Sequence, residues 1–524
     1  MTLEESINLC LENFSEFGLG DITVDDLEKD ILKNNKTEIA SEIKRRIGKG
    51  SIYEMDFRPI KYILTPKTRY IFDYRKASII DPMSLIMYTS LVFQMAETIE
   101  SKRIPISEQR VFSYRWEPNS PSVFNRSIGY DLWREKCKEQ IQLDSCRYIV
   151  KCDIASFYDR INLHRLESTL SSIGVEKALF SKINDILTFW SKKDSYGIPV
   201  GGVASRILAE AVLIDIDEYL VDEGINFIRY VDDFRIFCPT LVDAHVGITK
   251  IMQRLFRDGL MLNAGKTDLS VAIKDKEKEK EKDETEGDDG KEASEVLKTI
   301  TRLAGGYSRI VKTFIMPASD KYEPFLKIDI EKEIDTIRKA EIVDFSTIQK
   351  IVISSIVQKK YNYLSELTAN INQYVYAIDY FIDMLIKNKD YIPKKNRIEI
   401  KDSFILFIKN NSIAGFDWYE AKIAKILGFD EYFDKKTLLS IVKRTNKEST
   451  AYPSCIALES LAKHITRTDF RTLREWFDRC DDWEKRRIIN LCVALPEEEK
   501  KAWIKAVKST VSHDYFSKLL IEKC

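Results

Sequence analysis

The chain has 524 residues, of which 44% are hydrophobic and 31% are charged. Hydrophobic cores rarely grow beyond about 250–300 residues, so this length excludes a single domain and predicts two or three. The net charge of −1 balances 82 basic against 83 acidic residues, which still allows a local basic channel. The nine cysteines contain no Cys-x-x-Cys pair and are accompanied by only four histidines, which excludes a zinc-type cluster.

The chain divides into successive segments by pattern. Residues 1–50 are predicted to be helical because apolar residues recur at helical spacing among charged ones. Residues 58–135 are mixed and rich in Arg, Lys and Tyr, and from Arg147 to about Asp268 the pattern alternates between strands and helices, which predicts an α+β fold class. The highly charged stretch 273–294 is predicted to be a flexible insertion. In residues 295–524 the strand patterns fade, which predicts an all-α domain.

The last segment contains a series of short amphipathic helices joined by polar connections. Such a series is typical of stacked helical hairpins of the HEAT-like kind, and an irregular helical domain is the alternative because the repeat period is not clean. The predicted helices are Phe345–Gln358, Tyr374–Lys387, Glu399–Lys409, Tyr419–Leu427, Lys436–Lys443, Cys455–His464, Phe470–Cys480, Trp483–Val493 and Glu497–Val507.

Residues 227–237 carry two adjacent carboxylates between two runs of aromatic and β-branched residues. The run Phe-Ile-Arg-Tyr-Val precedes Asp232 and Asp233, and Phe-Arg-Ile-Phe follows them. This pattern predicts a β-hairpin with both carboxylates at its tip. The alternative is an ordinary turn, because Asp tolerates turn conformations.

A second carboxylate lies at the end of a predicted strand over residues 147–153. Asp153 closes this strand, and the chain then turns into a predicted helix. Beside the Asp232 hairpin it would create a dense negative site, whose like charges raise each other's pKa unless a cation neutralises them. Mg²⁺ suits carboxylate and phosphate oxygens. Two such ions can activate an attacking 3′-oxygen and stabilise a leaving pyrophosphate, and Mn²⁺ is the expected substitute.

Between these two pieces, Gly-Ile-Pro-Val-Gly-Gly over residues 197–202 leads into a predicted helix. Glycines let the backbone approach a ligand closely, and the alternative is a tight turn before a buried helix. The order Asp153-x₅-Asp159, Gly-x-Pro-x-Gly-Gly and Tyr-Val-Asp-Asp resembles motifs A, B and C of reverse transcriptases. Leu260-x-Leu-Asn-x-x-Lys266 further on resembles motif D.

The resemblance implies the fingers and palm of a right-hand polymerase over residues 51–272, acting on dNTPs. Its catalytic residues would be Asp153, Asp232 and Asp233, and its metal ligands Asp153, Ile154 and Asp232. Tyr158 falls at the family's sugar gate, where an aromatic ring excludes a ribose 2′-OH, although a packed core Tyr is the alternative. The implied nucleotide-binding residues are Lys67, Arg69, Tyr158, Gly201, Ser205 and Lys266.

Several departures point to one branch of that family. Val200 replaces the Gln found in most members, while the runs 111–115 and 205–210 resemble bacterial abortive-infection and defence-associated reverse transcriptases. The Val-Thr-Gly motif of retron enzymes, a Cys-rich endonuclease and an RNase H constellation are not found in the sequence. The resemblance therefore implies antiphage defence. It implies DNA synthesis that needs no template in some members and is primed by a protein tyrosine, so that the DNA product is covalently attached.

The partners follow from the same resemblance. We expect dNTPs, a DNA product, a homo-oligomer and, as an alternative, a non-coding RNA that serves as template. A further alternative is an interaction or sensor module on a scaffold polymerase fold. No signal peptide and no run of about 18 apolar residues is found, so we expect a cytoplasmic protein that does not contact a membrane.

Overall fold

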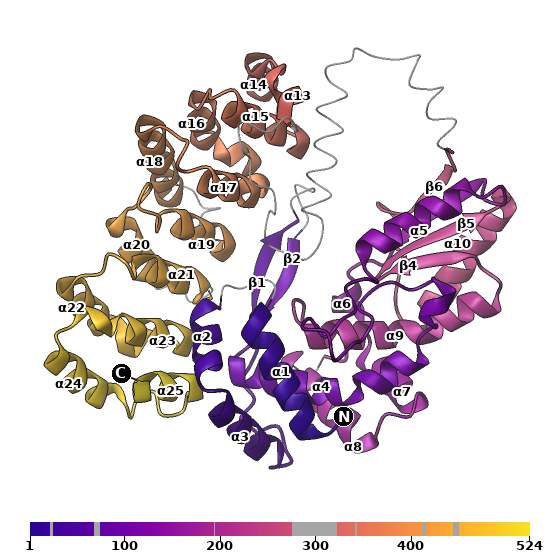
Figure 1. Ribbon diagram of the computed structural model, residues 1–524, viewed down its shortest axis with the longest axis horizontal. Coiled ribbons are helices and arrows are strands. Elements are labelled where there is room, and N and C mark those ends of the chain that lie inside the picture. Colours follow the sequence, from indigo (N-terminus) through magenta and orange to yellow (C-terminus); the bar gives the residue numbers. More distant parts are fainter. Residues whose placement is uncertain are drawn as a thin grey trace. The chain divides into compact units, whose positions relative to one another are not determined.

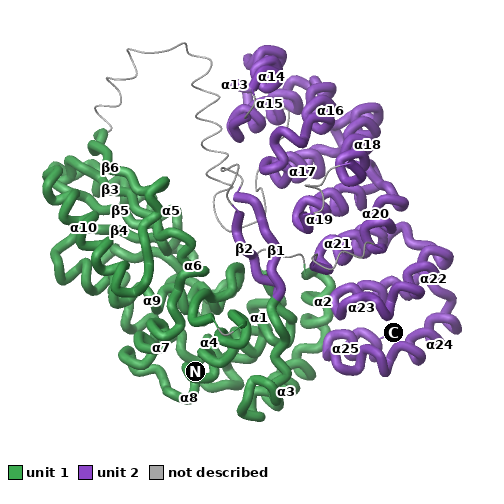
Figure 2. The backbone as a smooth tube through the Cα atoms, turned by 180° about the vertical axis from the view of Figure 1, so that it is seen from behind, with its two compact units in different colours: residues 1–20, 25–60, 80–285 green, residues 21–24, 61–79, 286–524 purple. Residues whose placement is uncertain are grey.

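The computed structural model describes residues 1–20, 25–67, 74–192, 194–274, 322–340, 343–410, 416–443 and 450–523. The chain forms two compact units, and each is discontinuous in sequence (Figure 2). Unit 1 contains residues 1–20, 25–60 and 80–285, and unit 2 contains residues 21–24, 61–79 and 286–524. Most of the expected insertion 273–294 and the predicted nucleotide-binding residue Arg69 lie outside the described residues.

Unit 1 begins with three helices, as the helical pattern of residues 1–50 predicts. Helix α1 starts at a capping box in which Thr2 and Glu5 bond each other's backbone, and it buries Ile7, Leu11 and Phe14. It packs on α4. The bounds are α1 Leu3–Phe17, α2 Asp26–Asn34, α3 Lys36–Ile47, α4 Pro82–Lys102 and the 3₁₀ helix η1 Ile106–Glu108.

A four-stranded antiparallel sheet in the order β4-β5-β3-β6 forms the rest of unit 1 together with its helices (Figure 1). Helix α9 is buried over most of its length and packs against α4, α7 and α10. The bounds are α5 Tyr130–Gln142, β3 Tyr148–Asp153, α6 Phe157–Arg160, α7 Leu163–Ser172, α8 Lys177–Trp190, α9 Val203–Asp222, β4 Phe227–Tyr230, β5 Asp233–Cys238, α10 Leu241–Arg257 and β6 Asp268–Val271.

Side chains alternate across this sheet, as the strand patterns predict. On one face Ile149, Ile228 and Phe237 pack with Trp133 of α5. On the other face Ile236 reaches Gly247 of α10, where a Cβ atom would lie only 3.2 Å from the Ile236 side chain. The sheet is therefore covered by helices on both faces, and functional side chains are left to its ends.

Unit 2 combines a two-stranded hairpin with a series of helices. Strands β1 (Lys61–Pro66) and β2 (Tyr74–Ile79) pair antiparallel. Every predicted helix of the C-terminal segment coincides with an observed one, and α17, α19, α21, α23 and α25 pack consecutively in one layer. The bounds are α13 Glu323–Leu326, α14 Ile330–Lys339, α15 Phe345–Val357, α16 Asn362–Ala369, η3 Ile371–Ala377, α17 Ile378–Lys387, α18 Lys394–Asn410, α19 Asp417–Ile426, α20 Lys435–Val442, α21 Tyr452–Leu461, α22 Arg467–Trp476, η5 Phe477–Arg479, α23 Asp482–Asn490, η6 Leu491–Ala494, α24 Glu497–Val507 and α25 Tyr515–Lys523.

The hairpin is the main difference from the expected organisation. We expected residues 61–79 to belong with the fingers and palm, whereas their contacts group them with the C-terminal helices. Within the parts of the chain that the structure describes, no helix combines the length and the apolar character needed to cross a bilayer.

Candidate active site

Three aspartates meet at one end of the sheet in unit 1. Strand β3 ends at Asp153, strand β5 begins at Asp233, and these two residues are direct partners in the antiparallel register. Asp232 lies in the turn between β4 and β5, and its carbonyl accepts a hydrogen bond of 3.3 Å from the backbone N–H of Ile154. The predicted carboxylate hairpin and the predicted strand end are both present, and the fold brings them together.

The turn that carries Asp232 has an unusual backbone conformation. Val231 has a φ of 56°, in the left-handed region that β-branched residues rarely adopt. Its carbonyl accepts a hydrogen bond of 3.0 Å from the guanidinium of Arg229. Because Arg229 is fully buried, this hydrogen bond is shielded from water and stabilises the conformation of the turn.

Arg229 is the centre of a buried ionic network. Its Nε lies 2.8 Å from Asp217, and its Nη1 lies 3.0 Å from Glu210. Glu210 also pairs with Arg103 at the end of α4, over 2.7 Å. Burial alone would raise the pKa of Glu210, but the two guanidiniums hold it below its usual value. The network therefore ties α4, α9 and β4 to the turn before Asp232.

The carboxylates repel one another in this desolvated setting. Burial, followed by the neighbouring charge of Asp153, raises the pKa of Asp232 to about 7. Burial also raises the pKa of Asp233, although the guanidinium of Arg235 opposes this effect and its Nη2 lies 3.3 Å from the carboxylate. Asp233 therefore has a cationic partner of its own, whereas Asp232 faces Asp153 as a like charge.

Two residues of the predicted fourth motif contact Asp153 directly. The ammonium of Lys266 lies 3.2 Å and 3.0 Å from the two carboxylate oxygens. Asn263 donates its backbone N–H to the carbonyl of Asp153 over 2.7 Å, and its side-chain amide lies 3.4 Å from the carboxylate. Lys266 was predicted to bind nucleotide, and the structure places it beside Asp153.

The donor set suits a hard divalent cation. The candidate ligands Asp153, Ile154 and Asp232 offer only carboxylate and backbone carbonyl oxygens, which Mg²⁺ prefers. No group of three or more His, Cys, Asp or Glu side chains in the described part of the chain is arranged as a complete metal site. In its usual protein mode Mg²⁺ is bound by one or two carboxylates, while waters and substrate phosphates supply the remaining ligands.

The glycine-rich loop packs against the short helix that follows Asp153. The N–H of Ile198 donates to the carbonyl of Tyr158 over 3.0 Å, and the N–H of Gly197 donates to the carbonyl of Ile161 over 2.8 Å. Gly197 has a φ of +91°, and a Cβ atom there would lie 3.3 Å from the Asp159 carbonyl oxygen. Glycine is thus required for this close approach.

The structure places the other predicted site residues in different settings. Tyr158 and Ile154 are buried, and Ser205 is buried with its hydroxyl 3.4 Å from the Tyr88 hydroxyl. Gly201 is partly exposed and lies two residues before the start of α9, with a φ of +108°. Lys67 directly follows β1 in unit 2.

Sequence reasoning missed the buried network and the partner of Asp233. Arg229 is the one charged residue in strand β4, which is otherwise aromatic or aliphatic. Glu210 and Asp217 are seven residues apart in the apolar helix α9, so they share one helix face. A cation in a buried strand and two acids on one face of a buried helix are signals that could have predicted the pairing.

Aromatic rings surround Tyr230, the residue that precedes the turn. The rings of Tyr114, Tyr130 and Trp133 lie 6.1 Å, 5.4 Å and 6.1 Å from it between centroids. Arg235 lies over Trp133 at 5.2 Å. Aromatic and guanidinium faces of this kind can stack on bases, and Tyr130 is 39% exposed.

A carboxylate pair at the end of a sheet, beside a glycine-rich loop and a lysine, is an arrangement suited to nucleotidyl transfer with divalent metal ions. Residues 110–286, which include this pair, match the family described as Reverse transcriptase (RNA-dependent DNA polymerase). The predicted enzyme class is confirmed: residues 110–286 match a reverse transcriptase domain, which implies a nucleotidyltransferase DNA polymerase. The α+β class, with a mostly helical C-terminal region, is confirmed as well. Enzymes of this family generally use divalent metal ions.

Solved structures give a weaker likeness. Apo telomerase from Candida tropicalis is 12% identical with a TM-score of 0.32, over 92% of this chain and 74% of that one. Telomerase from Candida albicans, in complex with a TWJ fragment of telomeric RNA, is 11% identical with a TM-score of 0.29, over 82% and 65%. These values are too low to indicate what this chain binds. No curated protein matches the chain.

Proposed function

We propose that this protein synthesises DNA from dNTPs at Asp153 and Asp232 with two Mg²⁺ ions, and that it does so in antiphage defence. The carrying observation is the carboxylate pair, in which burial and the neighbouring charge of Asp153 raise the pKa of Asp232 to about 7. The repulsion between the buried carboxylates would be relieved if a divalent cation bridged substrate phosphates to them.

Each residue of the candidate site would have a separate role. Asp153, Asp232 and the backbone of Ile154 would hold the ions, which when bound supply charge neutralisation for the attacking and leaving oxygens. Lys266, beside Asp153, would bind phosphate oxygens as a point charge. Asp233 is held by Arg235, and Arg229 holds the turn that orients Asp232.

The defence role rests on the sequence resemblance of residues 111–115 and 205–210 to abortive-infection enzymes. Under the same proposal synthesis needs no template and starts on a tyrosine of the protein. The C-terminal unit would form a HEAT-like array, which its consecutive helix contacts support, in a homo-oligomer. Mass photometry of the purified chain would report a monomer if the oligomer does not form.

The test is to incubate the purified protein with each labelled dNTP and Mg²⁺, without template or primer, and to treat half of each sample with protease. Label that migrates with the protein and is released by protease supports protein-primed synthesis. Incorporation only after RNA is added would favour an RNA-templated enzyme with a bound RNA. No incorporation under any of these conditions would overturn the proposed polymerase activity.

Two variants sharpen this test. Asp232→Ala is expected to abolish both incorporation and protection of cells against phage. Asp222→Asn, an exposed carboxylate near the end of α9, is the matched control and is expected to keep both. Phage protection that survives in Asp232→Ala would contradict the defence role of DNA synthesis and would favour the scaffold alternative.

A further inference from the structure

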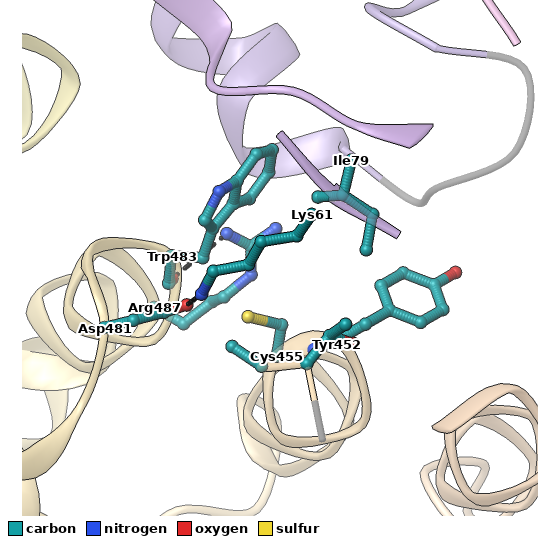
Figure 3. A pocket seen from close by; sticks show the side chains of 9 residues that line it. Lys61, Ile79, Tyr452, Cys455, Asp481, Trp483 and Arg487 are labelled. Atoms are coloured by element: carbon teal, nitrogen blue, oxygen red, sulfur yellow. Dashed lines mark hydrogen bonds and ion pairs between the residues drawn. The ribbon is translucent and has the colours of Figure 1, made fainter. Parts of the chain in front are cut away.

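The β1–β2 hairpin in unit 2 is covered by helices of its own unit. Strand β1 packs on α19, where the hydroxyl of Tyr419 lies 2.9 Å from the hydroxyl of Tyr74. At the other end of the hairpin, the ammonium of Lys61 lies 2.7 Å from Asp481, the N-cap residue of α23 (Figure 3). Helix α10 of unit 1 differs, because a large part of its apolar surface is exposed.

Helix α10 carries an exposed stripe on the side opposite its buried face. The buried face packs on β3, β5 and α9 and includes Ala244, Ile251 and Leu255. On the other side, Val242 is 70% exposed and Phe256 is 59% exposed. The exposed residues on this side form the α10 stripe, which consists of Val242, His245, Val246, Thr249, Met252, Gln253 and Phe256. Exposed apolar residues gathered on one face mark an interaction surface, whereas residues scattered singly do not.

The α10 stripe has a symmetric pattern about its central residue, Thr249. Val242 and Phe256 lie seven residues to either side of Thr249, and positions seven apart lie almost in line on an α-helix. If two copies of α10 packed antiparallel about a twofold axis at Thr249, Val242 of each copy would therefore come against Phe256 of the other. The helices would approach each other most closely at the small side chain of Thr249.

Charges at the ends of α10 favour the same arrangement. Asp243 lies in the first turn and Arg257 in the last turn, and both are exposed. In an antiparallel pair the Asp243 end of each copy meets the Arg257 end of the other, whereas parallel packing brings like charges together. The α10 stripe itself lacks Lys and Arg, which the binding of nucleic-acid phosphates would require. The face is therefore complementary to itself, as an interface with twofold symmetry must be.

We propose that the α10 stripe is the contact surface of a homodimer in which two copies of this chain pack antiparallel at Thr249. The inference rests on the proposed function, because it names the surface that would form the proposed homo-oligomer. Burial of the apolar residues drives association, and the charges at the helix ends select the antiparallel orientation. The α10 stripe contains no residue of the candidate active site, so dimer formation and nucleotide incorporation can be measured separately.

The test measures the dimer dissociation constant of the full chain by sedimentation equilibrium at low salt. Three double variants all remove the same two apolar side chains: Val242→Glu with Phe256→Glu, Val242→Lys with Phe256→Lys, and Val242→Lys with Phe256→Glu. In the antiparallel dimer the first two variants bring like charges together, and the third brings opposite charges together. We expect the dissociation constant to be about tenfold higher in the first two variants than in the third. Because both positions are exposed, all three should keep a Tm close to that of the wild type.

Val493→Lys is the matched control, because Val493 is 69% exposed in unit 2, and it should keep the wild-type dissociation constant. Equal dissociation constants in the three double variants would overturn the antiparallel contact, even if the wild type is an oligomer. A wild type that stays monomeric at every protein concentration would overturn the homo-oligomer as well. Nucleotide incorporation is assayed in the same samples. A wild-type dimer with the expected order of variants but no incorporation would support the interface and contradict the proposed polymerase activity.

Discussion

Arg229 donates a hydrogen bond from its guanidinium to the carbonyl of Val231, over 3.0 Å, one residue before the carboxylate of Asp232. Left-handed backbone costs a non-glycine residue roughly 1–2 kcal/mol, so the turn needs an external constraint. The fully buried guanidinium supplies it, and its own charge is balanced by Asp217 and Glu210. The orientation of Asp232 is thus determined by a residue that does not reach the site.

Replacing Arg229 should therefore impair catalysis more than stability. Arg229→Lys keeps the charge but loses the planar fork, and we expect kcat to fall about a hundredfold because a small displacement of Asp232 suffices for that loss. Arg115→Lys is the control, since Arg115 is buried and pairs with Glu100 over 2.7 Å without contacting the turn. Urea unfolding should show similar destabilisation of both variants. An equal loss of kcat in both would refute a specific effect on Asp232.

The pKa of Asp232 predicts how stability depends on pH. The folded value of about 7 lies above the ordinary 3.8, so the folded state keeps a proton that the unfolded chain releases. The free energy of unfolding should therefore fall as pH rises from about 4 to 7, by up to about 1.4 kcal/mol per pH unit. Asp232→Asn cannot ionise and should remove this part of the slope.

Urea titrations at several pH values in EDTA would measure the effect. The difference between wild type and Asp232→Asn isolates this group, because Asp25, whose pKa burial raises to about 6, titrates in both proteins. Saturating Mg²⁺ should also flatten the wild-type slope, since a bound cation favours the ionised carboxylate. Identical slopes for the two proteins in EDTA would show that Asp232 does not titrate in this range.

Lys266 should affect cation and nucleotide binding in opposite directions. Its ammonium lies 3.0 Å from Asp153 and competes with a divalent cation for that carboxylate. In Lys266→Met, the rise of Tm with Mg²⁺ should begin at lower Mg²⁺ in the absence of nucleotide, while the KM for dNTP rises about tenfold. Lys151→Met is the control, because Lys151 lies on strand β3 with Asp153 but pairs with Asp268. If Mg²⁺ binding and dNTP binding both weakened in Lys266→Met, the result would contradict competition between Lys266 and the cation for Asp153.

Two glycines of the glycine-rich loop are expected to have different roles, Gly197 in stability and Gly202 in nucleotide binding. Gly197→Ala should destabilise the fold by roughly 1–2 kcal/mol, because the residue has a positive φ and lies against the Asp159 carbonyl. A Cβ atom at Gly202 would meet no atom within 4 Å, and its φ is −134°. Gly202→Ala should therefore keep Tm close to the wild-type value but raise the KM for nucleotide. An unchanged KM would mean that no ligand approaches Gly202.

Much of the palm could be predicted because its polar residues lie in short local patterns. Asp153 closes a strand, and Asp232 and Asp233 interrupt a hairpin, so periodicity alone locates the carboxylates. The nine helices predicted in the C-terminal segment could be recognised in the same way, because each has an apolar face of its own. The roles assigned to these residues remain proposals, whereas their placement at one end of the sheet is observed.

The remaining features depend on pairs that are distant in sequence. Nothing near Tyr74 indicates that its hydroxyl meets Tyr419, and nothing near Lys61 indicates Asp481. Arg229 differs, because a cation in a buried strand indicates that it has an acidic partner, which the structure shows to be Glu210 on another element. Local patterns report which face of an element is buried but not what buries it, so they did not indicate that the hairpin groups with the C-terminal helices.

The hairpin also determines when during synthesis this polymerase can become complete. Its strands end at Ile79, whereas the residues that hold them, Tyr419 and Asp481, are translated hundreds of residues later. The aspartate-bearing sheet is translated in the interval, and an isolated two-stranded hairpin is marginally stable in water. A nascent chain that carries the sheet but not these residues would therefore hold its carboxylates without an anchored β1–β2 hairpin. Only a chain translated beyond Asp481 can form both the sheet and the attached hairpin.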